Sequence, residues 1–190
     1  MKIAAGQFTC VPADVSANVH TMAALTERAR ASGAELVVFP EPAVTGYELD
    51  AVRADPSLWA RTDDPRLDAI RESGIATVVN CVAATEGPLP AIGTRVFGAQ
   101  GELLTTYRKQ HLSEHEKDVF TAGRRDGRFD FAGVRFALAT FNDNHFPDLT
   151  SRGPANLGDA ATCQDLGPQG QHFGRPRARA GIGPESPWRG

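Results

Sequence analysis

The chain has 190 residues, a formal net charge of -3 and a pI near 5.9, so its length fits one domain with a real hydrophobic core. This charge argues against a nucleic-acid partner, because phosphate binding needs a concentrated Lys/Arg surface. Residues 1–10 lack the long apolar run of a secretory signal or membrane span. We therefore expect a soluble, cytoplasmic protein that has no membrane partner.

The cysteines are few and widely separated. Cys10, Cys81 and Cys163 do not have the number or the spacing of a disulfide framework or a zinc site. We expect reduced thiols. Nothing in the sequence calls for a metal or another cofactor.

The first forty residues predict a strand, a helix and a second strand. Residues 2–9 alternate enough to form a strand, and residues 15–29 repeat apolar side chains at helical spacing until Gly33 provides a stop. Residues 36–39 are a continuous apolar run that ends at Pro40, which is typical of a strand buried on both faces.

The α/β alternation continues in the middle of the chain. Asp64-Pro65 begins a short helix that Gly74 ends, and residues 75–84 resemble a strand. Residues 95–99 and 102–108 flank Gln100-Gly101, which predicts a hairpin. A further strand pair is expected around Ala132-Gly133, with residues 134–140 as its second member.

The last forty residues differ in composition. Residues 151–190 contain eight Gly, five Pro and five Arg, but only four residues drawn from Ile, Leu, Val and Phe. Such a segment cannot offset the entropy of ordering by burial. We interpret residues 1–152 as the folded unit and residues 153–190 as a tail. The tail is either naturally disordered or the product of a frameshift near residue 155 in a GC-rich gene, and we favour the frameshift.

Two charged residues follow predicted strands. Glu41 comes directly after the buried strand and Pro40, at the strand end where α/β folds place their sites, and a carboxylate there can act as a base. Lys109 follows the hairpin strand, and an ammonium held in a pocket can stabilise a developing oxyanion. The alternative for each residue is a solvated side chain on the surface.

A histidine pair offers a weaker pattern. His111 and His115 have i,i+4 spacing, but the segment lacks an HExxH pattern and an obvious third ligand. We favour solvated histidines over metal ligands. Asp143, His145 and Asp148 form a second polar cluster, also without a ligand spacing.

Three segments in order resemble the signatures of the nitrilase superfamily of carbon–nitrogen hydrolases. They are Phe39-Pro40-Glu41, residues 107–112 (YRKQHL) and residues 143–149 (DNHFPDL), and the resemblance extends over residues 1 to about 150. It implies an α/β fold, namely the N-terminal part of an α-β-β-α sandwich. It also implies a small amide or nitrile as substrate. The implied roles are general base for Glu41, oxyanion-facing cation for Lys109 and a supporting carboxylate for Glu116.

The same resemblance implies a cysteine nucleophile two residues before Asp143, where this chain has Phe141. A thiol of pKa about 8.5 attacks well only when a base and a cation favour the thiolate. Phenylalanine has no nucleophilic atom, and the three cysteines elsewhere lack the context of the motif. The resemblance therefore implies that Glu41 and Lys109 lie close together, with the ring of Phe141 in the space between them.

The resemblance also implies that the second half of the sandwich is missing, so we expect residues 1–150 to expose a large apolar sheet face or an open strand edge. We therefore predict a carbon–nitrogen hydrolase family member whose catalysis is impaired. Two alternatives stay open: a non-catalytic module that pairs with a full-length homologue, and the non-functional product of a decayed gene. The sequence leaves homo-oligomerisation and the identity of the substrate open.

Overall fold

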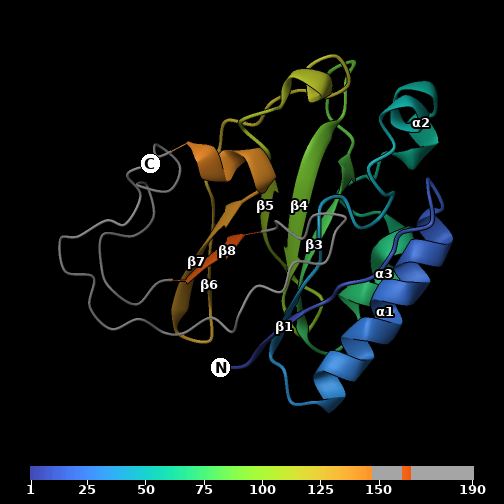
Figure 1. Cartoon of the computed structure of the whole chain (residues 1–190). Coiled ribbons are helices and arrows are strands. Elements are labelled where there is room, and N and C mark those ends of the chain that lie inside the picture. The colour runs from blue at the N-terminus through green and yellow to red at the C-terminus, as the bar shows by residue number, and fades with distance from the viewer. Residues whose placement is uncertain (147–159, 164–190) are drawn as a thin grey trace, which may run out of the picture.

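Two sheets and a layer of helices make up the part of the chain that the computed structural model describes, residues 1–146 and 160–163 (Figure 1). The helices and strands are β1 (Ile3–Ala5), α1 (Val15–Ala31), β2 (Leu36–Val38), α2 (Leu49–Ala54), α3 (Asp68–Arg71), β3 (Ala76–Ala83), β4 (Ala91–Phe97), β5 (Leu103–Arg108), β6 (Gly127–Phe131), β7 (Val134–Ala139) and β8 (Ala160–Cys163). Short 3₁₀ turns lie at Pro56–Leu58, Pro65–Leu67, Glu114–Glu116 and Phe141–His145.

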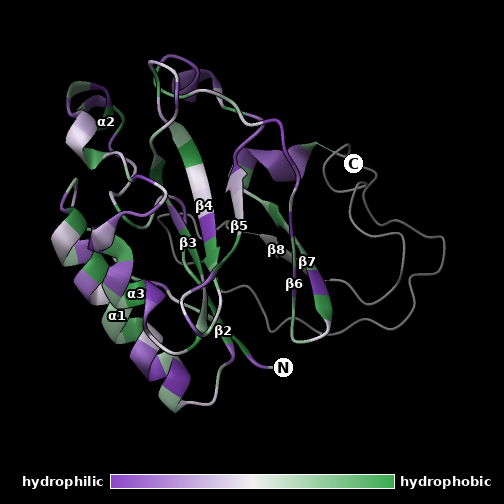
Figure 2. Cartoon of the chain, turned by 180° about the vertical axis from the view of Figure 1, so that it is seen from behind, coloured by the Kyte–Doolittle hydropathy of each residue, from purple (hydrophilic) through white to green (hydrophobic). Residues whose placement is uncertain are grey.

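Helix α1 confirms the helical periodicity of residues 15–29. The side chain of Asp14 caps its first turn by accepting a hydrogen bond from the backbone N–H of Ala17 at 2.9 Å. Its buried side chains recur at three- and four-residue intervals, and Figure 2 shows hydrophilic residues interspersed along the same helix. The buried residues are Val15, Asn18, Val19, Met22, Thr26 and Ala29.

The larger sheet has the strand order β1-β2-β3-β4-β5. Strands β1, β2 and β3 run parallel, whereas β4 and β5 add antiparallel partners, so the predicted hairpin around Gln100-Gly101 is confirmed. All three residues of β2 are buried, as expected for a central parallel strand. The carboxyl end of β2 therefore opens into a loop that begins inside the protein.

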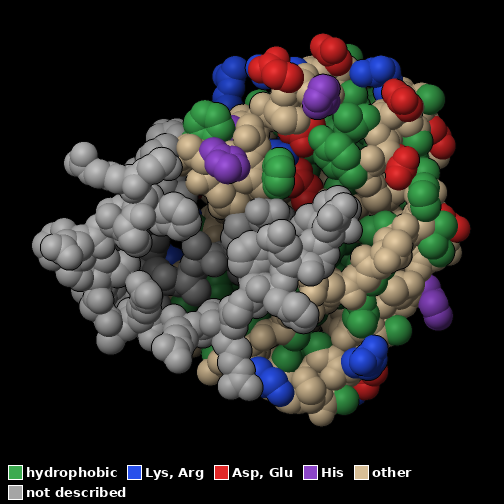
Figure 3. Space-filling view, in the orientation of Figure 1, with side chains coloured by type: hydrophobic (Ala, Val, Ile, Leu, Met, Phe, Trp, Pro, Cys, Tyr) green, Lys and Arg blue, Asp and Glu red, His purple; other side chains and the backbone are tan. Residues whose placement is uncertain are grey.

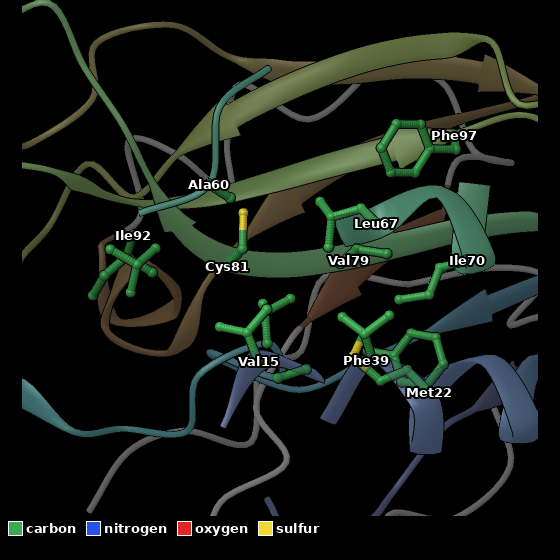
Figure 4. Close-up of a cluster of buried hydrophobic side chains, with 14 of the residues drawn as sticks. Val15, Met22, Phe39, Ala60, Leu67, Ile70, Val79, Cys81, Ile92 and Phe97 are labelled. Carbon is green, nitrogen blue, oxygen red and sulfur yellow. The ribbon is translucent and has the colours of Figure 1, made fainter. Parts of the chain in front are cut away.

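The first hydrophobic core lies between the helices and one face of this sheet. Helices α1 and α3 lie along that face in Figure 1, and Figure 4 shows their apolar side chains meeting those of the strands. Met22 and Ile70 of the helical layer belong to the same cluster as Phe39, Val79 and Ile92. Burying such side chains stabilises the fold by about 1.5–3 kcal/mol each.

The second sheet corrects the expectation of an exposed apolar face. Strands β6 and β7 pair in antiparallel fashion across Ala132-Gly133, as predicted, and β8 pairs parallel with β7. The rings of Phe129 and Phe136 stack with their centroids 4.9 Å apart. They belong to a second buried cluster with residues of β2, β3, β4 and β5. The face of the larger sheet that lies opposite the helices is thus covered, because β6 and β7 pack against it.

Other elements differ from the expectations. The predicted helix between Asp64 and Gly74 consists of a 3₁₀ turn followed by the four-residue α3, and helix α2 was not predicted. Residues 160–163 form β8, although they fall in the segment expected to be a tail without regular structure. The rest of that segment lies outside the described residues. No helix in the described ranges is long and apolar enough to span a membrane.

Candidate active site

The site lies where the loops after β2 and β5 of the larger sheet meet the 3₁₀ turn after β7 of the smaller sheet. Glu41 follows β2 after Phe39 and Pro40, in a loop that is buried almost throughout and held by hydrogen bonds such as that from Ala43 N–H to the Pro40 carbonyl at 2.9 Å. Lys109 directly follows β5. Its own N–H donates to the Ile92 carbonyl of β4 at 2.9 Å, which continues the pairing of the two strands.

Lys109 forms two short ion pairs with carboxylates from different parts of the chain. Its Nζ lies 2.7 Å from Glu41 Oε1 and 2.8 Å from Glu116 Oε1. The side chains of Lys109, Glu41 and Glu116 are 0%, 7% and 1% exposed. The predicted proximity of Glu41 and Lys109 is confirmed, and neither is the solvated residue that the alternative interpretation required.

Glu41 differs from an ordinary carboxyl group in its protonation. Burial raises its pKa from 4.5 to about 7, although the charge of Lys109 and its hydrogen bond act in the opposite direction. The negative charges of Glu116 and Asp143 raise the pKa further. A carboxyl group with a pKa near neutrality can both accept and release a proton at physiological pH.

Glu116 is fixed by donors on both of its oxygens. Its Oε2 accepts a hydrogen bond from the Ser113 N–H at 2.7 Å, in a capping box at the start of the 3₁₀ turn. Its Oε1 accepts from the Tyr47 hydroxyl at 3.0 Å as well as from Lys109. Burial, followed by the charge of Glu116, raises the pKa of Tyr47 well above its ordinary value. Tyr47 was not among the predicted residues, because nothing local distinguishes it from a surface tyrosine.

Phe141 stands beside this charged group. Its ring centroid lies 5.4 Å from Lys109 Nζ, within the range of a cation–π contact. Its backbone adopts a φ of +41°, in the left-handed region that costs a residue with a Cβ about 1–2 kcal/mol. The residue is 46% exposed. Because Lys109 Nζ and Glu41 Oε1 are 2.7 Å apart, no ring fits between them, and the prediction that Phe141 lies between the two charges is wrong.

Asp143 and His111 form a second polar group next to Phe141. Asp143 is fully buried and accepts hydrogen bonds from the Tyr107 hydroxyl and from backbone N–H groups. His111 Nδ1 lies 3.2 Å from Asp143 Oδ1, and its ring stacks on Phe146 with centroids 3.7 Å apart. His111 is therefore a partly buried, paired side chain, which corrects the expectation of a solvated histidine.

The two cysteines whose side chains the structure describes do not resemble activated nucleophiles. Burial raises the pKa of the Cys10 thiol, whose Sγ lies 3.5 Å from the Ala43 carbonyl. Cys81 is completely buried beside Arg95, and burial again raises its pKa. The side chain of Cys163 lies outside the described residues.

The described residues show no metal-binding cluster. Within residues 1–146, no three His, Cys, Asp or Glu side chains gather as a metal site would require. In Figure 3 acidic and basic side chains intermingle along the upper edge of the visible face. Glu41, Lys109 and Glu116, to which the resemblance assigned roles, converge at one place.

The family model for carbon-nitrogen hydrolases matches residues 2–161. The chain belongs to the carbon–nitrogen hydrolase family. It is 30% identical over 130 residues to an (R)-stereoselective amidase from Pseudomonas sp., a match that covers 67% of this chain and 46% of the amidase. It is 27% identical over 150 residues to a glutamine-dependent NAD(+) synthetase from Acinetobacter baylyi, covering 75% of this chain and 27% of the synthetase.

Solved structures of the family have the same fold. An amidase from Nesterenkonia sp. AN1, described as a member of the nitrilase superfamily, superposes with a TM-score of 0.73 at 25% identity, covering 86% of this chain and 65% of the amidase. Another structure of an amidase from this genus gives a TM-score of 0.69 at 27% identity, covering 78% of this chain and 58% of the amidase. The nitrilase-like α/β architecture is thereby confirmed. The chain spans about a quarter to two thirds of the length of the proteins it matches.

Proposed function

We propose that this carbon–nitrogen hydrolase family member binds small amides at Glu41, Lys109 and Glu116 but does not hydrolyse them by a covalent thiol route. The observation that carries the proposal is the pair of contacts from Lys109 Nζ to Glu41 and Glu116, at 2.7 and 2.8 Å in a buried setting. In this reading Glu41 is the general base, Lys109 is the cation that faces the amide oxygen, and Glu116 is the supporting carboxylate.

The chemistry of the three groups suits an amide. The ammonium of Lys109 can attract the carbonyl oxygen of the ligand, where negative charge would develop during attack. Glu41 can exchange a proton near neutral pH because burial raises its pKa to about 7. Glu116, held by Ser113 and Tyr47, keeps the ammonium in place.

The impairment follows from Phe141. In a glutamate-to-glutamine variant of the Nesterenkonia amidase, acrylamide added covalently to the active-site cysteine by Michael addition. In the present chain the position that the family motif gives to that cysteine is occupied by a side chain without a nucleophilic atom. A cysteine-to-alanine variant of the same amidase was solved in complex with butyramide. Amide binding by that enzyme therefore does not need the thiol, and we extend this property to the present chain.

Binding of butyramide tests the first half of the proposal. We expect the purified chain to bind butyramide in ligand-observed NMR or calorimetry, and Lys109→Met to abolish the binding. The exposed Lys117, whose side chain is 54% accessible, supplies the matched control, and Lys117→Met should bind as the wild type does. Equal binding by the wild type and Lys109→Met would contradict the proposal.

Installing the thiol tests the second half. The wild-type chain should release no ammonia from primary amides above background. In Phe141→Cys, a thiol beside the Lys109 ammonium should be partly ionised and should react with acrylamide faster than Cys10, whose pKa burial raises. Peptide mapping by mass spectrometry measures both rates in one sample. Labelling of residue 141 no faster than Cys10 would show that the site does not activate a nucleophile there.

A further inference from the structure

Asp143 connects the two segments that carry Lys109 and Phe141. Its Oδ1 accepts hydrogen bonds from the backbone N–H groups of Gln110 at 3.2 Å and His111 at 2.8 Å, directly after Lys109. Its Oδ2 accepts from the N–H of Thr140, directly before Phe141, at 3.0 Å. One carboxylate thus joins the end of β5 to the end of β7.

Two side chains complete the environment of this carboxylate. The Tyr107 hydroxyl donates to Asp143 Oδ2 at 2.6 Å, and Tyr107 belongs to the buried cluster between the sheets. Burial and the hydrogen bond to Asp143 raise the pKa of Tyr107 well above its ordinary value, so the hydroxyl keeps its proton. The His111 ring approaches Oδ1 through Nδ1 at 3.2 Å.

The contact with His111 selects a tautomer. A carboxylate can only accept hydrogen bonds, so the Nδ1 atom that faces it must carry the proton in the neutral ring. The basic nitrogen of neutral His111 is then Nε2. This arrangement resembles the orientation of a catalytic histidine by a buried aspartate, in which loss of the carboxylate leaves the wrong tautomer.

We propose that Asp143 is a positioning residue, which sets the spacing between Lys109 and residue 141 and holds His111 in the Nδ1–H form. This role deepens the proposed amide-binding function, because the cation that would face the amide oxygen sits on the segment that Asp143 anchors. The strained backbone of Phe141 fits the same role, since a φ of +41° persists only when its surroundings impose it. Asp143 bonds to the N–H just before that residue.

The tautomer of His111 provides the first test. Nitrogen-15 NMR of histidine-labelled protein, at a pH where the rings are neutral, distinguishes the two tautomers, and His111→Gln identifies the His111 signals. We expect the Nδ1–H form in the wild type. Asp143→Asn should shift His111 towards the Nε2–H form that imidazoles favour in water. An Nε2–H form in the wild type, or an unchanged form in Asp143→Asn, would overturn the proposal.

The protection of Lys109 provides the second test, which needs no substrate. Lys2, Lys109 and Lys117 are the lysines of this chain, and carbamylation by cyanate can be mapped for each by mass spectrometry. We expect Asp143→Asn to raise the labelling of Lys109 relative to Lys117 about tenfold, because loss of hydrogen bonds to a charged acceptor favours local opening. An unchanged ratio would overturn the proposal.

Two variants serve as controls. Asp130→Asn removes an exposed carboxylate paired with Arg135 and should leave the His111 signals and the lysine ratio unchanged. Tyr107→Phe removes one donor to Oδ2 but leaves the His111 contact, so it should keep the tautomer while raising the Lys109 ratio by a smaller factor.

If Asp143→Asn does not fold, the wild-type spectrum and Tyr107→Phe still decide the proposal. If the wild-type chain does not bind butyramide but the His111 tautomer and the Lys109 labelling ratio are as expected, only the proposed amide site is contradicted.

Discussion

The hydroxyl of Tyr47 donates a hydrogen bond to Glu116, which lies 69 positions later in the chain, on the same oxygen that receives Lys109 Nζ. Tyr47 is 48% exposed, whereas Glu116 is 1% exposed. A partly exposed side chain therefore contributes to the polar group at the centre of the site, and it connects the loop after β2 to the 3₁₀ turn after β5.

Tyr47→Phe should lower the free energy of unfolding by about 1 kcal/mol, because it removes a hydrogen bond to a carboxylate that Lys109 still holds. Urea denaturation measures the change. The Glu116→Gln variant and the double variant complete a thermodynamic cycle, and we expect a coupling energy of at least about 0.5 kcal/mol. Strict additivity of the two changes would mean that the hydrogen bond contributes nothing.

Glu41 should make stability depend on pH. Its folded-state pKa of about 7 lies above the ordinary value of 4.5, so its contribution is fully present below pH 4.5 and is lost as pH rises through 7. Over this window the wild type should lose up to about 3 kcal/mol relative to Glu41→Gln. Urea denaturation at a series of pH values measures the difference. Glu35→Gln, which changes a half-exposed carboxylate, is the matched control and should retain the pH profile of the wild type.

Phe141→Gly should be more stable than Phe141→Ala by about 1 kcal/mol. Both variants lose the ring and its contact with Lys109, so their difference isolates the backbone, which adopts a positive φ that glycine accepts without strain. Thermal or urea denaturation of the two variants side by side gives the value. Equal stability would mean that residue 141 relaxes out of the left-handed region when the ring is removed.

Gly127→Ala should cost about 1–3 kcal/mol, because the two sheets approach closely at this position. A Cβ on Gly127 would lie 2.7 Å from Tyr107 Cβ, well inside van der Waals contact. Gly87→Ala is the control, since a Cβ there would meet only the Thr85 hydroxyl at 3.6 Å. Unfolding free energies of the two variants should therefore differ clearly. A cost at Gly127 no larger than at Gly87 would show that β6 can move away from β5 freely.

The elements with strong periodicity were predictable from the sequence. The stripe of α1, the buried run of β2 and the turn residues of the two hairpins are local features, and each led to the element found in the structure. Short segments without a period, such as α2 and the 3₁₀ turn before α3, were missed or misjudged. Elements of three to six residues are too short to show the apolar period that marks α1.

Some residues of the site could likewise be predicted from the sequence, and others could not. Two of the three nitrilase-like motifs contain Glu41 and Lys109. The resemblance also pointed to Glu116 and to Phe141, two residues before Asp143. Short motifs can be recognised from local sequence alone. The contributions of Tyr47 and Tyr107 could not be recognised in this way, since each depends on a hydrogen bond across 69 or 36 positions.

The sequence alone determined which chemical groups the protein contains: the carboxyls of Glu41 and Glu116, the ammonium of Lys109, and a phenyl ring at position 141, where the resemblance leads us to expect a thiol. The tertiary structure decided the pKa of Glu41 and the distances between these groups. Burial between helices and sheets removes water from Glu41 and raises its pKa, brings Lys109 within 2.8 Å of two carboxylates, and lets Asp143 join two strand ends. The strength of these interactions depends on local dielectric and distance, which only the packed chain defines.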